Sequence, residues 1–426
     1  MSHGPVLNIN IDEAMKARPI KLDDWTRKFL WSFVLIGITT FIVGYFKFDP
    51  AYVWGVYYTN LVFWMGLALG GVIIACIFQI VRAQWSPPVR RIAEANVAFL
   101  PWAFILFLGT YFGRNTLFPW ARGPMPGREW WMDPCFVYIR FFVLFSLLFF
   151  LMYRYVRLSL RSDIGLLREK HKEDWIGVNY QRLTNGWKGS DEEIKSIQVK
   201  LSRMAPALIA LYAIIYSLFA FEMVMGLDSI WYSNLFGGFF FVGNVYMGWA
   251  MLAILTVVFS SWNSDYAKTV STQQLWDIGK LTLGFAILWG YLFFSQYLPQ
   301  WYGNLPEETQ WMLLRTRGIW MPLSYAVLGM CFVFPFIWLL SEDLKKTPWA
   351  LSIVAMVILT GVWLEKYVII MPQLMPKFIP LFHFPFLEIG FFVGFLGIYG
   401  LSILGFLKKY PFIPVSHPMT RGSIDW

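Results

Sequence analysis

Long runs of apolar residues, separated by shorter polar segments, dominate the pattern of this chain. Ten runs are long enough to cross about 30 Å of hydrocarbon. They cover residues 29–46, 52–81, 92–113, 135–155, 203–225, 235–262, 274–298, 318–340, 348–371 and 385–406. The runs lack the alternation of strands, and a backbone in lipid must satisfy its own polar groups, so we expect helices. The pattern predicts an all-α polytopic membrane protein with about ten transmembrane helices.

Similar short segments recur in the second and sixth runs. Residues 63–66 (FWMG) and 245–248 (VYMG) end on glycines 182 positions apart, and Glu94 and Asp277 open the third and seventh runs at nearly the same offset. Since four helices, an even number, separate the equivalent segments, we expect two parallel repeats rather than inverted ones.

This repeat predicts an organisation into two four-helix bundles with flanking helices. The first bundle, residues 52–225, comprises helices 2–5 with a polar loop over 156–202, and the second, residues 235–371, comprises helices 6–9. Helix 1 (29–46) and helix 10 (385–406) flank them, between terminal segments 1–28 and 407–426. Acids and bases are mixed in residues 1–28, which argues against a secretory signal.

The distribution of charge indicates the orientation. Most of the 35 Lys and Arg residues lie in the terminal segments and in the 2–3, 4–5, 6–7 and 8–9 connections. The positive-inside rule then places both termini in the cytoplasm. Anionic lipid accounts for the net charge of +9 without any need for nucleic acid.

Ionisable residues within apolar runs are the main candidates for chemistry, because burying a charge in hydrocarbon is costly. Glu222 and Glu365 stand near the outer ends of helices 5 and 9, and Glu94 and Asp277 near the cytoplasmic ends of helices 3 and 7. We read the four acids, with Lys280, as a candidate proton path. A structural role is the alternative for Glu94 at a helix start and for Asp277 paired with Lys280. A gap of about 20 Å separates the two layers.

A second candidate site lies near the outer face. Tyr57, Tyr58 and Asn60 on helix 2, with Arg140 and Glu222, could form an apolar cleft with a few polar groups, as a quinone headgroup would need. The alternative is a structural salt bridge from Arg140 to Glu222 or Asp133. A further outer polar cluster, His383 with Glu388, is best read as packing against a neighbouring subunit.

Ligands for redox cofactors are scarce. The chain has four His, which lie in polar segments or near the end of a helix, and three scattered Cys. A transmembrane haem usually takes facing axial ligands from helix interiors, and iron–sulfur clusters need grouped thiolates. We therefore expect no haem, no iron–sulfur cluster, no metal and no covalently bound cofactor in this chain, so that electrons would pass through a quinone or through other subunits.

These features resemble the NrfD/PsrC-like integral membrane subunits, and most closely the ActF-type subunits of bacterial alternative complex III. The resemblance implies a menaquinol:electron acceptor oxidoreductase complex in the bacterial cytoplasmic membrane, in respiration or photosynthesis. It implies as partners a sister NrfD-like subunit, a periplasmic iron–sulfur subunit, c-type haem subunits and lipids. An ActF-type subunit would act as scaffold and proton path, with Glu222 and Glu365 at the outer ends of the bundles and Glu94 and Asp277 at the inner ends. The alternatives are the quinol-binding subunit itself, with menaquinone bound, or a secondary transporter.

Overall fold

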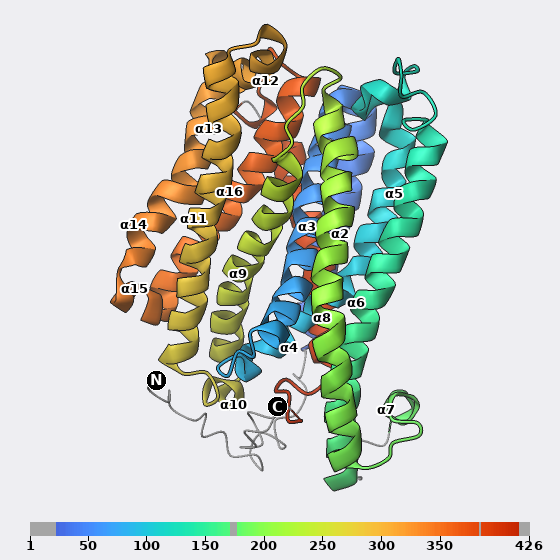
Figure 1. Ribbon diagram of the computed structural model, residues 1–426, viewed down its shortest axis with the longest axis vertical. Helices are drawn as coiled ribbons and strands as arrows, with labels where there is room; N and C mark the ends of the chain where they lie inside the picture. Colours follow the sequence, from blue (N-terminus) through green and yellow to red (C-terminus); the bar gives the residue numbers. More distant parts are fainter. Residues whose placement is uncertain (1–22, 171–176, 383–384, 417–426) are drawn as a thin grey trace.

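Ten long apolar helices build the part of the chain that the computed structural model describes, residues 23–170, 177–382 and 385–416. No strand occurs in that part, so the chain is an all-α, multi-pass membrane protein (Figure 1). The spans are α2 (Asp24–Lys47), α3 (Pro50–Ile80), α4–η1–α5 (Pro87–Leu117), α6 (Pro134–Lys170), α8–η4–η5 (Ser190–Leu227), α9 (Phe236–Trp262), α11 (Thr272–Gly303), η6–α13–η7–α14 (Gly318–Leu340), α16 (Pro348–Leu374) and α17 (Phe386–Leu407).

Short helices connect the spans at two opposite faces. One face carries η2 (Pro119–Ala121), α12 (Pro306–Thr316) and η8 (Pro380–Phe382), and is called the α12 face below. The opposite face carries α7 (Val178–Leu183), α10 (Ser264–Ala267) and α15 (Glu342–Lys346), and is called the α10 face (Figure 1). The α10 face is the one that the charge distribution predicts to be cytoplasmic.

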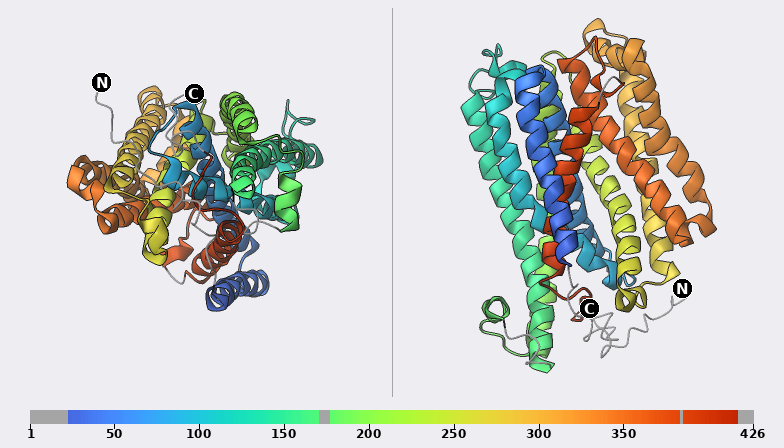
Figure 2. Two further views of the ribbon diagram at one scale, coloured as in Figure 1. Left: turned by 90° about the horizontal axis from the view of Figure 1, so that it is seen from below. Right: turned by 180° about the vertical axis from the view of Figure 1, so that it is seen from behind.

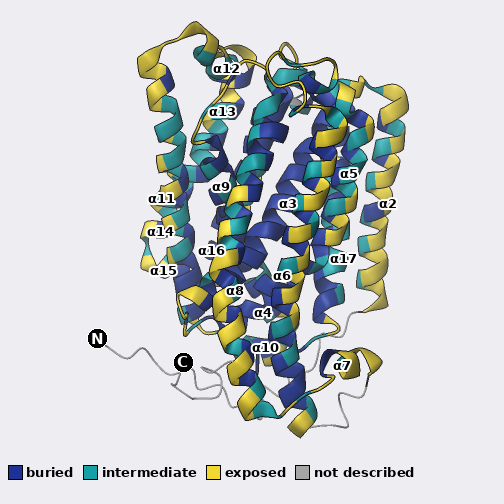
Figure 3. Cartoon of the chain, turned by 45° about the vertical axis from the view of Figure 1, so that its right-hand side comes forward, coloured by how far each residue is buried: buried dark blue, intermediate teal, exposed yellow. Residues whose placement is uncertain are grey.

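The helices pack as two rings of four, and the two rings contact each other in the centre of the molecule. In the first ring α3 packs on α5 and α8, and α6 packs on α8 and α5. In the second, α9 packs on α11 and α16, and these two helices contact the span that contains α13 and α14. The rings meet where α3 contacts α9 and α16 and where α8 contacts α9. Since α3 lies at this centre, nearly all of it is buried (Figure 3).

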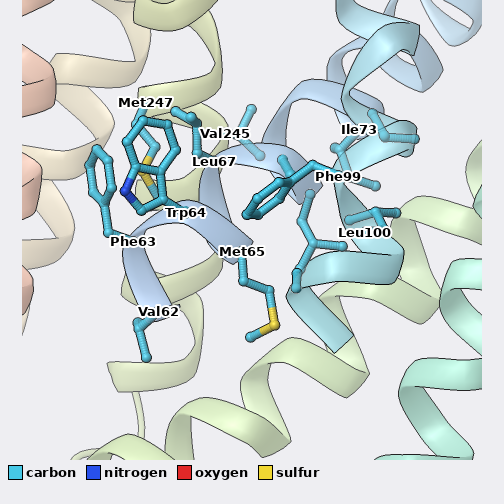
Figure 4. Packing of buried hydrophobic residues seen from close by; sticks show 14 of the residues in the cluster. Val62, Phe63, Trp64, Met65, Leu67, Ile73, Phe99, Leu100, Val245 and Met247 are labelled. Carbon is cyan, nitrogen blue, oxygen red and sulfur yellow. The ribbon is translucent and has the colours of Figure 1, made fainter. Parts of the chain in front are cut away.

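The central contact between α3 and α9 depends on the glycines of the repeated segments. A Cβ added to Gly66 would lie 2.3 Å from Asn244 Oδ1, and one added to Gly248 would lie 2.9 Å from the backbone of Gly70. Small residues allow such close approach of helices in a membrane, where no hydrophobic force draws them together. Neighbours of these glycines, such as Trp64 and Met247, belong to one buried cluster (Figure 4).

The flanking helices pair with each other across the length of the molecule. α2 and α17 make an extensive contact, and α2 otherwise lies at the edge of the molecule, with most of its surface exposed (Figure 2). A Cβ on Gly394 would lie 2.6 Å from the Cα of Gly37, and one on Gly390 would lie 2.1 Å from Thr40 Oγ1. Small residues therefore set this crossing as well.

On the α10 face several helices extend beyond the predicted apolar runs. α6 continues to Lys170 instead of ending near 155, and α8 begins at Ser190 instead of near 203, so much of the predicted 156–202 loop is helix. The third span begins at Pro87 rather than 92. The extensions of α6 and α8 are amphipathic rather than uniformly apolar: apolar side chains such as Ile164 and Ile197 are buried, while most of the charged ones are exposed.

Candidate functional site

Glu222 lies in an irregular turn near the α12 face. The π-helical segment η4 (Ala220–Val224) carries it, and such single π turns are frequent at functional sites. Its Oε1 accepts a hydrogen bond of 2.7 Å from the indole Nε1 of Trp131, and its Oε2 is paired with Arg140. The Arg140 guanidinium also lies over the Trp131 ring, 4.1 Å from its centroid. The predicted alternative, a salt bridge between Arg140 and Glu222, is therefore formed.

Glu365 has the same kinds of partner in the second ring. Its Oε2 accepts a 2.7 Å hydrogen bond from the indole Nε1 of Trp289, and its Oε1 lies 2.6 Å from Lys366 Nζ. Lys366 is fully buried, and its ammonium lies 4.0 Å from the centroid of the Phe240 ring. The duplicated glutamates thus each bind one cation and one indole.

Glu388 is a third buried acid near the α12 face and differs from the other two. Its carboxylate accepts hydrogen bonds from the hydroxyls of Tyr52, at 2.6 Å, and Tyr367, at 2.9 Å. Within the described ranges no Lys or Arg is paired with it. Its exposure is 2%, so the reading of Glu388 as a contact for a neighbouring subunit was wrong. His383, predicted beside it, lies outside the described residues.

Glu94, near the α10 face, is the centre of a fully buried network of charges. It is paired with Arg90, at 3.2 Å, and with Arg91, and accepts a 2.8 Å hydrogen bond from Ser159. Arg91 also pairs with Asp163. Two arginines and two carboxylates balance one another here, as buried charges must. Sequence reasoning missed Asp163 because it lies beyond the predicted end of its helix.

Asp277 has simpler surroundings than Glu94, its predicted counterpart. Its carboxylate lies 2.6 Å from Lys280 Nζ and accepts a 3.0 Å hydrogen bond from Gln273. Nearly half of the Lys280 side chain is exposed. The geometry is that of the helical i, i+3 pair expected as the structural alternative, so the two acids of the α10 face do not form equivalent sites.

Contacts of α3 locate the two acid layers relative to each other. The Tyr58 hydroxyl donates to the Met223 carbonyl, beside Glu222, while the Tyr155 hydroxyl, which belongs to the Glu94 network, donates to the Ala75 carbonyl. From position 58 to 75 an α-helix rises about 25 Å. The distance between the two layers of acids is thus close to the predicted gap of about 20 Å.

A small polar cluster lies about midway between the layers. Asn244 packs beside Gly66 and Gly70 and donates a 3.0 Å hydrogen bond to the Tyr212 hydroxyl. The Asn244 Oδ1 atom and the neighbouring Tyr216 hydroxyl are buried without a hydrogen-bond partner in the described part of the chain. By contrast, the hydroxyls of Thr256, Thr282 and Thr360 donate to carbonyls of their own helices.

The predicted quinone cleft in the first ring is not assembled. Tyr57 donates to the carbonyl of Leu106, and the Asn60 amide donates to Val56 and accepts a hydrogen bond from Trp363. Only Tyr58 reaches the segment of Glu222, and it does so through the backbone of Met223. These polar groups are engaged on different sides of α3, so they do not converge on one ligand.

A cavity of about 100 Å³ instead opens inside the second ring, near the α12 face. Glu365 contributes to its wall, together with Arg315, Gln300 and several aromatic side chains. Sequence reasoning missed this pocket because its lining comes from five separate segments of the chain. In the sequence Arg315 is only one of the charges of the 7–8 connection, but in the structure its exposure is 4%.

Among residues 23–170, 177–382 and 385–416, no three His, Cys, Asp or Glu side chains are grouped closely enough to hold a metal ion. Cys76 and Cys331 are buried and Cys135 is exposed, all as free thiols. Comparison with models of protein families and with curated proteins gave no match.

Proposed function

We propose that this chain is a membrane subunit of a quinol-oxidising electron-transfer complex, in which it is a scaffold and carries a proton path. The proposal follows the resemblance to NrfD/PsrC-like subunits, closest to the ActF type of alternative complex III. On this proposal the chain lies in a bacterial cytoplasmic membrane with both termini in the cytoplasm. Its partners are a sister NrfD-like subunit, a periplasmic iron–sulfur subunit and c-type haem subunits, and menaquinol is the reductant.

The observation that carries the proton path is the duplicated site at Glu222 and Glu365. Each acid is buried among helices, where an ionisable side chain usually has a function. Each is held by a cation and an indole donor, which fix its position and offset its charge. A structural salt bridge would account for one such site. The chain has two, in corresponding helices of the two rings, and this duplication favours a function.

Protons on this path would pass between the acids of the α12 face and the Glu94 network. The Asn244 cluster divides the distance of about 25 Å into two shorter steps. Its unpartnered oxygen atoms can bind water, and a buried water usually makes about three hydrogen bonds to polar groups that otherwise lack partners. The geometry favours Glu94 over Asp277 as the entrance, because Asp277 is paired with the half-exposed Lys280 and lacks a buried network.

Purification of the full chain in mild detergent tests its membership in a complex. We expect it to co-purify with subunits that contain c-type haem and iron–sulfur clusters, recognised by their absorption and paramagnetic resonance spectra. Isolation as a free protein that transports a solute after reconstitution would instead support the secondary transporter.

A test of the proton path requires variants in which no buried cation is left unpaired. We expect the fourfold variant Arg140→Gln, Glu222→Gln, Glu365→Gln and Lys366→Gln to assemble and oxidise quinol, because both ion pairs are replaced by neutral pairs. Proton translocation per quinol in vesicles should fall at least twofold. The variant Asp265→Asn with Lys268→Gln, which neutralises an exposed pair near the α10 face, is the control. If the fourfold variant translocates as many protons per quinol as the unchanged chain, the two acids are structural.

A further inference from the structure

The charges of the Glu94 network are shielded from water although they lie near the α10 face. Arg90, Arg91, Glu94 and Asp163 each have an exposure of 1% or less. Their mutual pairing makes this burial tolerable, but the exclusion of water requires that another part of the chain covers the network.

The segment after α17, residues 408–416, lies directly against this network. It forms turns and bends rather than a helix, and in Figure 1 it is the dark red loop at the α10 face. Ser416 donates to Asp163 from its backbone N–H, at 2.8 Å, and from its hydroxyl, at 2.6 Å. The same hydroxyl lies 2.7 Å from the hydroxyl of Ser162. Since residues 411–416 are all buried, the segment closes this side of the network.

Other contacts extend the segment across the ends of both rings. The Phe412 ring lies against two aromatic rings of the second ring of helices, with its centroid 4.2 Å from that of Tyr266 in α10 and 5.4 Å from that of Phe259 in α9. On the side of the first ring, the hydroxyl of Tyr180 in α7 donates to the Lys409 carbonyl at 2.6 Å. The segment is thus held at several points, by side chains rather than by a ladder of backbone hydrogen bonds.

Polar groups beneath the segment would gain partners if water entered. Arg90 Nη1, Arg91 Nε and the Tyr266 hydroxyl are buried without a hydrogen-bond partner in the described part of the chain. A buried donor without a partner costs free energy that water would recover. Irregular segments with few backbone hydrogen bonds also open at a lower cost than helices. Displacement of the segment is therefore less costly than that of any span around it.

We propose that residues 408–416 are a movable cover over the Glu94 network. In place, the segment keeps water from Glu94, and when it is displaced, water reaches Glu94 from the α10 face. The cover itself follows from the contacts above. Its effect on protons rests on the proposed function, in which Glu94 is the entrance of the proton path, because a buried carboxylate exchanges protons with the solvent through hydrogen-bonded water.

Labelling of the variant Ser162→Cys with a water-soluble maleimide tests the cover in the full chain in detergent. Ser162 lies beneath Ser416 with an exposure of 2%. The chain supplies two reference thiols, the exposed Cys135 and the buried Cys331. We expect the introduced thiol to react at least tenfold more slowly than Cys135 and at least tenfold faster than Cys331, as measured by peptide mass spectrometry. A rate equal to that of Cys135 would mean that nothing covers the network, and a rate equal to that of Cys331 would mean that the cover does not move.

Truncation of the Ser162→Cys chain identifies the segment as the cover. A chain that ends at Tyr410 lacks most of the segment, whereas a chain that ends at Ser416 keeps it and is the matched control. The introduced thiol should react at least tenfold faster in the shorter chain and at an unchanged rate in the control. If it stays protected in the shorter chain while Cys331 also stays protected, other elements exclude the water and the proposal is wrong.

A second variant serves if rapid labelling of Cys331 shows that the shorter chain has unfolded. Phe412→Ala removes the contacts with Tyr266 and Phe259 and should raise the labelling rate of Ser162→Cys at least threefold. Phe236→Ala is the matched control, because it removes an equally buried ring near the α12 face and should leave that rate unchanged. Equal rates in the two variants would contradict the proposal.

The labelling results and the proposed function can fail separately. If truncation exposes the Ser162→Cys thiol but the fourfold variant translocates protons like the unchanged chain, the cover exists and the proposed proton path is wrong. If the thiol stays protected in the truncated chain but the fourfold variant loses proton translocation, the cover is wrong and the path stands.

Discussion

At the scale of single residues, the three buried acids near the α12 face differ in what holds their charge. Glu222 and Glu365 have cationic partners, whereas Glu388 has two tyrosine hydroxyls. Removing one member of a buried ion pair typically costs about 3–5 kcal/mol, because the other charge remains without compensation. A carboxyl that bonds only to hydroxyls can lose its charge without leaving a cation behind. Glu388 can therefore accept a proton with less disturbance of its surroundings than the other two.

This difference predicts how glutamine is tolerated at the two kinds of site. Glu222→Gln leaves Arg140 buried without a counter-charge and should lower the midpoint of thermal unfolding in detergent by several degrees. Glu388→Gln keeps one acceptor oxygen for one of the two tyrosine hydroxyls and can donate its amide N–H to the oxygen of the other, so it should lower the midpoint much less. The exposed Glu129→Gln is the control and should have no effect. Equal losses at Glu222 and Glu388 would contradict the role given to the Arg140 pair.

At the scale of helices, glycines rather than large apolar residues determine how the flanking pair is packed. The Cα of Gly37 lies where a side chain on Gly394 would begin, so α2 and α17 must separate if that glycine gains a methyl group. A Cβ added to Gly405, on the same helix, would meet no atom of another described segment within 4 Å. The intrinsic propensity for helix favours Ala over Gly by about 1 kcal/mol at both positions.

Alanine at these two glycines should therefore have opposite effects. Gly394→Ala is expected to lower the thermal midpoint in detergent and to make α2 more accessible to protease. Gly405→Ala should leave the midpoint unchanged or raise it slightly. A neutral Gly394→Ala would mean that the contact between α2 and α17 contributes little to stability.

Most of this helical arrangement follows from the apolar pattern, and most of the site does not. Apolar length alone predicts the ten spans, whereas the close approach of the FWMG and VYMG segments through Gly66 and Gly248 is found only in the structure. The extensions of α6 and α8 could not be predicted from hydropathy, because their surfaces are charged and hydropathy detects only the apolar part of a helix. Partners such as Tyr52 and Glu388 are 336 positions apart, and no local pattern relates them. The acids could thus be found from the sequence, but the groups that control their charge could not.

At the scale of the whole molecule, the Glu94 network joins segments that are remote in the chain. Asp163 on α6 pairs with Arg91 on α4, and its Oδ1 accepts hydrogen bonds from the backbone N–H of Ser416, at 2.8 Å, and from the Ser416 hydroxyl, at 2.6 Å. One carboxylate thus holds the segment after α17 against the first ring. Since all these groups are buried, water does not compensate for the loss of any one of them.

We therefore expect substitutions in this network to lower the free energy of unfolding by different amounts. Asp163→Asn leaves an uncompensated positive charge among Arg90, Arg91 and Glu94, which should cost about 3–5 kcal/mol and expose the segment after α17 to protease. Ser416→Ala removes only hydroxyl hydrogen bonds and should cost about 1 kcal/mol. Ser402→Ala is the matched control, because that hydroxyl bonds only to its own helix. Thermal midpoints and proteolysis of the full chain in detergent show which of the three variants loses most stability and which loses least. If Asp163→Asn and Ser402→Ala unfold alike, then the segment after α17 is held by its apolar residues Phe412, Ile413 and Val415, which are also buried, and not by the charges.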